Sequence, residues 1–258
     1  MERQVYWVRV LGGFALEKPT GELELSLSRP RALAVLAVLT VAGSLGCTRD
    51  RLIGLLWSEK DEERARHNLR DAVYAIRTAL GSEALTGQGD ALHLNPTMVD
   101  SDVHRFSTAM KEGRHAEAIA LYAGPLLDGF HVDEAPEFER WLDGERTHLL
   151  RERQQAAKQL AREAEQEEHW DAAAGWWARA VEVDPCNSRL VIRRMVALWR
   201  AGDRANAIEE GEAHRTLLRV ELDIEPDAAF MEMLTQIRDG GGSVQFFTPQ
   251  PWRPARDS

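Results

Sequence analysis

Arginines at helical spacing dominate the chemistry that this sequence offers. In residues 61–81, DEERARHNLRDAVYAIRTALG, a turn of roughly 100° per residue brings Arg66, Arg70 and Arg77 onto one stripe. Guanidinium groups bond guanine edges or phosphate oxygens bidentately, so this stripe is typical of a helix that reads DNA. Taken alone, the segment also fits a solvated surface helix with charge pairs four residues apart.

An apolar stripe lies beside the arginines and would dock the helix on a small core. This stripe consists of Leu69, Val73, Ile76 and Leu80. Further polar residues join or border the arginines: Arg64, His67, Asn68 and Tyr74. The segment therefore has one face for packing and one for recognition.

The sequence offers little for catalysis. Its 8 histidines are scattered, and no GxSxG, HExxH, P-loop or paired-cysteine motif occurs. The glycines at 240–242 follow a predicted helix, whereas a phosphate cradle precedes one. Three tryptophans at helical spacing indicate core packing more than a stacking platform for a small ligand: Trp170, Trp176 and Trp177. We expect no enzyme activity, no catalytic residues, no cofactor and no metal site.

Short strands and a buried helix come first in the chain. Residues 3–10 alternate with a period of two, and residues 14–17 and 22–27 carry further strand signals around a Pro-Thr-Gly turn. The sequence RALAVLAVLTVAG, which follows Pro30, is apolar all round and predicts a buried helix closed by Gly43. A small antiparallel sheet is therefore expected before the first helix.

The arginine-rich helix is the third of three and precedes a hairpin. Thr48 is a good N-cap for the second helix, RDRLIGLLW. Turn signals at 87–90, between residues 83–86 and 91–94, predict a β-hairpin. A short sheet, three helices and a hairpin, in this order, are typical of a winged helix, whose second and third helices form the helix-turn-helix. An unrelated α+β domain is the alternative.

Helices separated by short breaks fill the rest of the chain. They are expected at 101–111, 115–122, 136–168, 171–183, 188–201, 204–221 and 226–238. Anchoring a tetratricopeptide unit on Pro185 puts Ala173, Trp177 and Ala180 at its small, aromatic and small positions. We therefore predict a mainly α protein with a small β component, in which a winged helix-turn-helix precedes a tetratricopeptide-like helical solenoid. The expected domains are 1–99 and 100–240, followed by a tail or linker at 241–258.

The acidity is unevenly distributed. The formal net charge is −10, but residues 1–100 hold 12 basic and 13 acidic residues, whereas residues 101–240 hold 18 and 28. Non-specific DNA affinity should therefore be weak and salt-sensitive. Cys47 and Cys186 are far apart and outside any CxxC pattern, which indicates neither a disulfide nor a zinc site. Because we find no signal peptide or apolar membrane span, we expect a cytoplasmic location and no membrane partner.

Several blocks of sequence, in one order and spacing, resemble a known family. They are LGGFALE, RPRALAVLAVL, RDRLIGLLW, ERARHNLRDAVYAIRTALG, LDGFH, EVDPCNSRLVIRRMVALWRAGDRANAI and LLRVELDIEPDAAF. Together the chain resembles transcription factors of the Streptomyces antibiotic regulatory protein type, in which a winged helix precedes a bacterial transcriptional activator domain. In the last repeat, Ile208 and Gly211 stand where the family pattern has leucine and tyrosine.

The resemblance implies sequence-specific binding to double-stranded DNA, often at direct repeats, and activation through contacts with RNA polymerase. The helical domain would position neighbouring protomers on DNA or contact partner proteins. By position, four residues of the third helix would face the major groove: Arg66, Arg70, Tyr74 and Arg77. The second helix would bond phosphates at its start through Thr48, Arg49 and Arg51, and the wing offers Gln88 and His93.

The leading hypothesis is therefore a DNA-binding transcriptional activator. The alternative is a tetratricopeptide-like interaction scaffold with a vestigial winged helix, in which the acidic helical array is a docking surface for another protein.

Overall fold

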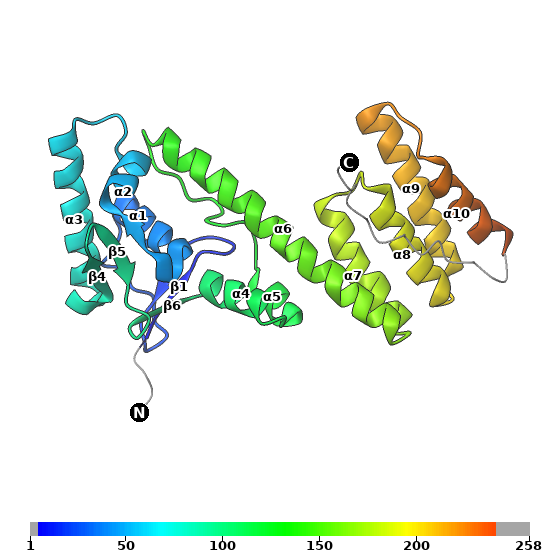
Figure 1. Ribbon diagram of the computed structural model, residues 1–258, viewed down its shortest axis with the longest axis horizontal. Coiled ribbons are helices and arrows are strands. Elements are labelled where there is room, and N and C mark those ends of the chain that lie inside the picture. The colour runs from blue at the N-terminus through cyan, green and yellow to red at the C-terminus, as the bar shows by residue number, and fades with distance from the viewer. Residues whose placement is uncertain (1–4, 241–258) are drawn as a thin grey trace, which may run out of the picture. The chain divides into compact units, whose positions relative to one another are not determined.

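The computed structural model describes residues 5–240 (Figure 1). The chain divides into two compact units, residues 1–160 and 161–258, and the division falls inside the long helix α6 (Pro136–Gln166). The predicted fold is confirmed: a winged N-terminal part with small sheets precedes a tetratricopeptide-like helical part. The expected tail at 241–258 lies outside the described residues. No helix among residues 5–240 has the length and apolar character needed to cross a membrane.

Strand β1 (Tyr6–Arg9) is the centre of the first sheet. It pairs antiparallel with β2 (Ala15–Glu17) and parallel with β6 (Val99–Ser101). Local pattern did not predict β6, because its partner lies about ninety residues away in the chain and its three residues carry no periodicity of their own. The sheet therefore joins the first and last strands of the winged part.

The strand predicted at 22–27 is wrong. Only Leu23 bridges to β2, and Leu25 is 77% exposed. The Glu24 carboxylate accepts a hydrogen bond from the Ser26 N–H, so the backbone turns locally instead of extending along β2. Of the three alternating leucines here, Leu23 and Leu25 are therefore exposed and only Leu27 is buried.

Helix α1 (Pro30–Ala42) is the buried helix that the sequence predicts, and its residues from Ala34 to Thr40 are all buried. It ends at Gly43, whose φ of 55° favours glycine, and the short 3₁₀ turn η1 (Gly43–Leu45) follows. The N-cap is Arg29, because Pro30 is the first helical residue.

Helices α2 (Arg49–Leu56) and α3 (Glu62–Leu80) have polar N-caps. Thr48 Oγ1 accepts from the Arg51 N–H, and the Asp61 carboxylate accepts from the Arg64 N–H. Helix α3 ends at Gly81, and the 3₁₀ turn η2 (Ser82–Ala84) leads into the wing.

The wing is a three-stranded antiparallel sheet. Strand β5 (Ala91–Leu94) pairs with β4 (Leu85–Gln88) on one side and with β3 (Cys47–Thr48) on the other. Because β3 runs directly into α2, the wing is continuous with the helix-turn-helix. The predicted hairpin is present, with its first strand two residues later in the chain than the expected residues 83–86.

A buried carboxylate connects this winged part to α4 (Asp102–Lys111) and the following α5 (His115–Leu121). The Asp102 carboxylate accepts hydrogen bonds of 2.9–3.0 Å from the N–H groups of Val10 and Leu11, and one of 2.7 Å from Val103. Burial raises the pKa of Asp102, although these three backbone hydrogen bonds oppose the shift. The end of β1 is thereby fixed to the start of α4.

Residues 123–135, here called the strap, lie against the same edge. The Leu127 N–H donates to the Val10 carbonyl at 2.7 Å, and the Gly12 N–H donates to the Pro125 carbonyl at 3.0 Å. From α6, the Arg146 guanidinium donates to the carbonyls of Leu126 and Leu127. The domain boundary expected after residue 99 therefore lies inside the first compact unit.

The second unit consists of the end of α6 with α7 (Trp170–Val183), α8 (Ser188–Arg200), α9 (Arg204–Leu222) and α10 (Ala228–Asp239). The tetratricopeptide-like positions Ala173, Trp177 and Ala180 are all buried. The Trp177 Nε1–H donates to Glu165, which also pairs with Arg193 at 3.2 Å. Small residues and one aromatic thus allow close helix packing, as the repeat pattern predicts.

Gly211 of α9 explains why the family's aromatic is absent from the last repeat. A Cβ built on Gly211 would lie 2.7 Å from Leu234 Cδ1 and 3.0 Å from Met195 Cε. Leu234 belongs to α10 and Met195 to α8, so α9 approaches both neighbouring helices at this glycine. The space of an aromatic ring is taken by these two side chains.

His214 is a buried polar residue of α9, only 4% exposed. Its Nδ1 lies 3.1 Å from the Pro185 carbonyl oxygen and its Nε2 lies 2.8 Å from Ser188 Oγ. A carbonyl only accepts, so the neutral ring carries its proton on Nδ1 and accepts from the Ser188 hydroxyl at Nε2. Burial lowers the pKa of His214.

Asp102→Asn should destabilise the first unit by about 1–3 kcal/mol, because an amide places N–H donors against backbone N–H donors. Urea denaturation, read by hydrogen exchange of peptides from residues 5–160, measures this loss. The control is Asp128→Asn at an exposed position, which should stay within about 0.5 kcal/mol of wild type. Equal stability of Asp102→Asn and wild type would show that the carboxylate is dispensable.

Gly211→Phe should destabilise the second unit by about 1–3 kcal/mol or more, because the ring overpacks against Leu234 and Met195. Gly175→Ala is the matched control in α7, since nothing lies within 4 Å of its built Cβ. It should raise stability by roughly 0.5–1 kcal/mol. Denaturation of both variants tests whether Leu234 and Met195 fill the space beside Gly211. Unchanged stability of Gly211→Phe would show that they do not.

The second unit should lose stability as the pH falls below the ordinary histidine value of 6.5. The lowered pKa of folded His214 means that the unfolded chain takes up this proton first, so its contribution is complete above pH 6.5 and is lost on acidification. Thermal unfolding from pH 8 to pH 5 measures the slope. His214→Gln should flatten it, whereas His169→Gln, at an exposed site, should not; equal slopes for all three proteins would refute the prediction.

Candidate nucleic-acid interface

Helix α3 is amphipathic in the way the sequence predicts. Leu69, Ile76 and Leu80 are buried, while Arg66, Arg70, Tyr74 and Arg77 are exposed. Val73 differs from the prediction because it is only half-buried. It lies at the boundary of the two faces, where the helix surface turns from the core toward a hollow.

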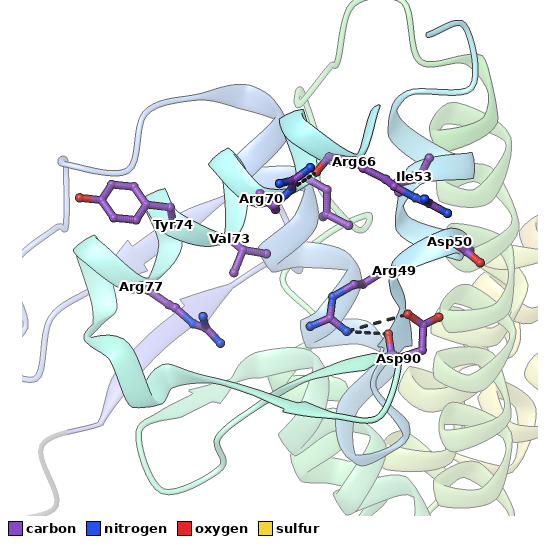
Figure 2. Close-up of a pocket in the computed structure, with 10 residues that line it drawn as sticks. Arg49, Asp50, Ile53, Arg66, Arg70, Val73, Tyr74, Arg77 and Asp90 are labelled. Atoms are coloured by element: carbon purple, nitrogen blue, oxygen red, sulfur yellow. Dashed lines mark hydrogen bonds and ion pairs between the residues drawn. The ribbon is translucent and has the colours of Figure 1, made fainter. Parts of the chain in front are cut away.

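This hollow has a volume of about 590 Å³ and is bounded by α2, α3 and the wing turn (Figure 2). Its lining comprises Arg49, Asp50, Ile53, Arg66, Leu69, Arg70, Val73, Tyr74, Arg77 and Asp90. The structure therefore brings together the four α3 residues predicted to face DNA, with Arg49 of α2. Five of the lining residues were not predicted as site residues: Asp50, Ile53 and Asp90, together with Leu69 and Val73 of the predicted apolar stripe.

The arginines of α3 differ in how far they are neutralised. Arg66 pairs with Glu62 at 2.5 Å, whereas the Arg70 Nε–H donates only to the Arg66 carbonyl at 3.3 Å. Arg77 Nη2 donates to the Leu85 carbonyl at the start of the wing, at 3.1 Å. Within residues 5–240, Arg70 and Arg77 have no carboxylate at ion-pair distance. Both keep N–H groups and a full charge available to an anion.

Tyr74 is an exposed aromatic side chain on α3, at 72%. In Figure 2 it extends away from Arg49 and Asp90, toward the outer edge of the hollow. An exposed aromatic ring beside arginines is a contact surface for a thymine methyl group or a sugar.

The three residues predicted to bond phosphates at the start of α2 differ in how exposed and how free they are. Thr48 is exposed, and its Oγ1 is the helix cap; Arg51 is exposed on the same turn. Arg49, predicted to bond a phosphate, donates its backbone N–H to the Asp90 carbonyl at 3.1 Å. Its guanidinium also bonds the wing turn, at Gly89 and Asp90. Sequence offers no signal for this contact, which joins residues 40 positions apart.

The remaining candidates lie outside the lining of the hollow. Arg64 pairs with Asp61 at 3.3 Å, and His67 pairs with Asp71 at 3.4 Å. Asn68 is half-buried.

The two wing candidates lie on β4 and β5. His93 is half-buried, beside Gly46 at the base of the wing. Gln88 ends β4, and its side chain lies outside the described part of the structure.

Residues 5–240 contain no group of three or more His, Cys, Asp or Glu side chains arranged to hold a metal ion. The polar groups that converge at the hollow are instead guanidiniums. Cations on an exposed helix beside a wing are suited to bind a polyanion.

A family model described as the bacterial transcriptional activator domain matches residues 101–238, which is more than half of the chain. The matched region starts at the last residue of β6 and ends within α10.

Similarity to two known proteins extends beyond this domain of the chain. Regulatory protein AfsR of Streptomyces griseus is 26% identical over 223 residues, which are 83% of this chain and 23% of AfsR. The structure of EmbR from Mycobacterium tuberculosis, in complex with a low-affinity phosphopeptide, matches with a TM-score of 0.67 and 19% identity. The match covers 93% of this chain and 66% of EmbR, and shows a shared fold. The chain spans less than a quarter of the length of AfsR.

The domain match, the AfsR similarity and the winged N-terminal fold agree with one another. The chain belongs to the bacterial transcriptional activator domain family and is organised as a transcription factor of the Streptomyces antibiotic regulatory protein type.

Proposed function

We propose that the chain is a transcriptional activator that binds specific double-stranded DNA through the hollow beside α3. The observation that carries this proposal is the convergence of Arg66, Arg70 and Arg77 on one exposed face, next to α2 and the wing. Helix α3 occupies the recognition position of a winged helix-turn-helix. Family membership as a transcriptional regulator supports the same function.

Each part of the interface has a distinct role. Arg70 and Arg77 are the base-reading candidates, because neither is paired with an acid within residues 5–240. Arg66 shares its charge with Glu62 and therefore binds less strongly until DNA displaces the carboxylate. Tyr74 contacts the groove edge.

Phosphate contacts come from the flanks of the hollow. We assign Thr48 and Arg51 to the backbone at the start of α2, with Arg64, His67 and Asn68 along the outer edge of α3. Gln88 and His93 are the wing candidates. Phosphate contacts set the register on the duplex, while the central arginines read the sequence.

We also propose a functional division at residue 99. Residues 1–99 contact DNA, whereas residues 100–240 contact RNA polymerase or a neighbouring protomer on repeated sites, and residues 241–258 serve as a tail or linker. Few cations on the DNA face predict modest affinity for a single site, so binding at adjacent repeats supplies the remaining affinity by avidity.

Arg70→Ala should weaken binding to the selected DNA site by about 10–100-fold, because a bidentate base contact is worth about 1–3 kcal/mol. Fluorescence anisotropy with the full chain at fixed salt measures the change. The loss should be much smaller for non-specific DNA, since a base contact discriminates between sequences.

Arg151→Ala is the matched control, because Arg151 is exposed on α6, away from α3. It should bind the site as tightly as wild type. If Arg70→Ala also bound with unchanged affinity, the assignment of α3 as the reading helix would be wrong. If the wild-type chain bound no DNA at low salt yet formed a stable protein complex, the interaction-scaffold alternative would hold.

A further inference from the structure

Two arginines connect the wing to the helices. Arg77 of α3 donates to the Leu85 carbonyl, where β4 begins, and Arg49 of α2 reaches the opposite end of that strand. Arg49 Nη1 lies 3.0 Å from the Asp90 carbonyl oxygen and 3.3 Å from that of Gly89. In Figure 2, dashed lines join the guanidinium end of the Arg49 side chain to Asp90.

The Arg49 backbone strengthens this connection. Its N–H donates to the same Asp90 carbonyl at 3.1 Å, and the Asp90 carboxylate lies 4.0 Å from the guanidinium. The guanidinium also lies over β4, since a Cβ built on Gly87 would be 3.5 Å from Arg49 Nη2. One residue thus bonds the wing turn through both its backbone and its side chain.

The wing carries no lysine or arginine that could attract phosphates, so its position at DNA depends on contacts such as that of Arg49. Residues 85–94, LTGQGDALHL, contain no lysine or arginine, and Asp90 is their one acidic residue. A wing of this composition gains nothing from phosphates by charge, and its turn carries a carboxylate that phosphates repel. Its contribution to DNA binding depends on where it is held.

We infer that Arg49 is a positioning residue that fixes the wing turn against α2, and not a phosphate contact. Two carbonyl oxygens occupy its Nη1 donor, and its positive charge offsets Asp90. A planar guanidinium is suited to lie across the turn, whereas a lysine ammonium is a point charge on a flexible stem. The DNA part of this inference rests on the proposed function.

The first test needs no DNA. In the full chain, Arg49→Ala and Arg49→Lys should both speed hydrogen exchange of the amides in residues 86–92 by on the order of tenfold, because losing the side-chain hydrogen bonds removes about 1–1.5 kcal/mol. Exchange in α1 should not change, which shows that the core remains folded. Arg51→Ala is the control, since its side chain makes no hydrogen bond to residues 5–240, and it should leave wing exchange unchanged.

The second test measures the salt dependence of DNA affinity. The slope of log K against log salt is negative. Arg51→Ala should reduce its magnitude by about 0.9, as expected for one lost phosphate contact. Arg49→Ala should lower affinity with the slope unchanged, and Arg49→Lys should not restore it, although it keeps the charge.

Two results would overturn the inference: a reduced slope for Arg49→Ala with normal wing exchange, or full recovery of affinity in Arg49→Lys. A wild-type chain that bound no DNA would refute the proposed function alone. Hydrogen exchange would still decide whether Arg49 holds the wing.

Discussion

The buried carboxylate of Asp102 is the constraint on which the first unit depends. It accepts the N–H groups of Val10 and Leu11 at the point where β1 ends and the chain turns away. Beside it, β6 pairs in parallel with β1, and the strap bonds the next residues of the same edge. A buried acceptor with several donors is costly to replace, because every donor left without it stays desolvated. The winged helix is therefore built onto the first helices of the activator domain and is not a separate body on a linker.

That arrangement holds in place the face of the nearly neutral winged part that we propose binds DNA. Buried apolar residues of α3 fix the direction of Arg70 and Arg77, and Arg49 and Arg77 in turn fix both ends of the wing strand. Arginine therefore bonds the protein's own carbonyls at this site and, in the function we propose, also bonds DNA. Family membership makes the chain a transcriptional regulator, and this geometry is the basis for proposing where DNA is bound.

Local pattern predicted the helices and the hairpin but not the contacts between distant segments. Helix ends could be predicted because the residues that begin or end a helix act on the backbone of their nearest neighbours in the chain. Examples are Pro30, Gly43, Thr48 and Gly81. The stripe of Arg66, Arg70 and Arg77 followed from helical spacing alone. Strand β6, the role of Asp102 and the wing contact of Arg49 depend on partners 40 to 93 residues away, and no periodicity encodes them. The segment 22–27 shows the converse, an alternating pattern that forms only one bridge to β2 and no strand.

The central claim is that this winged helix reads a DNA sequence. Selection of sequences bound by the full chain from a random pool of double-stranded DNA, at controlled salt, tests it most directly. We predict enrichment of a short motif, repeated at a fixed spacing, with affinity that falls steeply as salt rises. Recovery of an unchanged pool, with no DNA retained even at low salt, would contradict the claim.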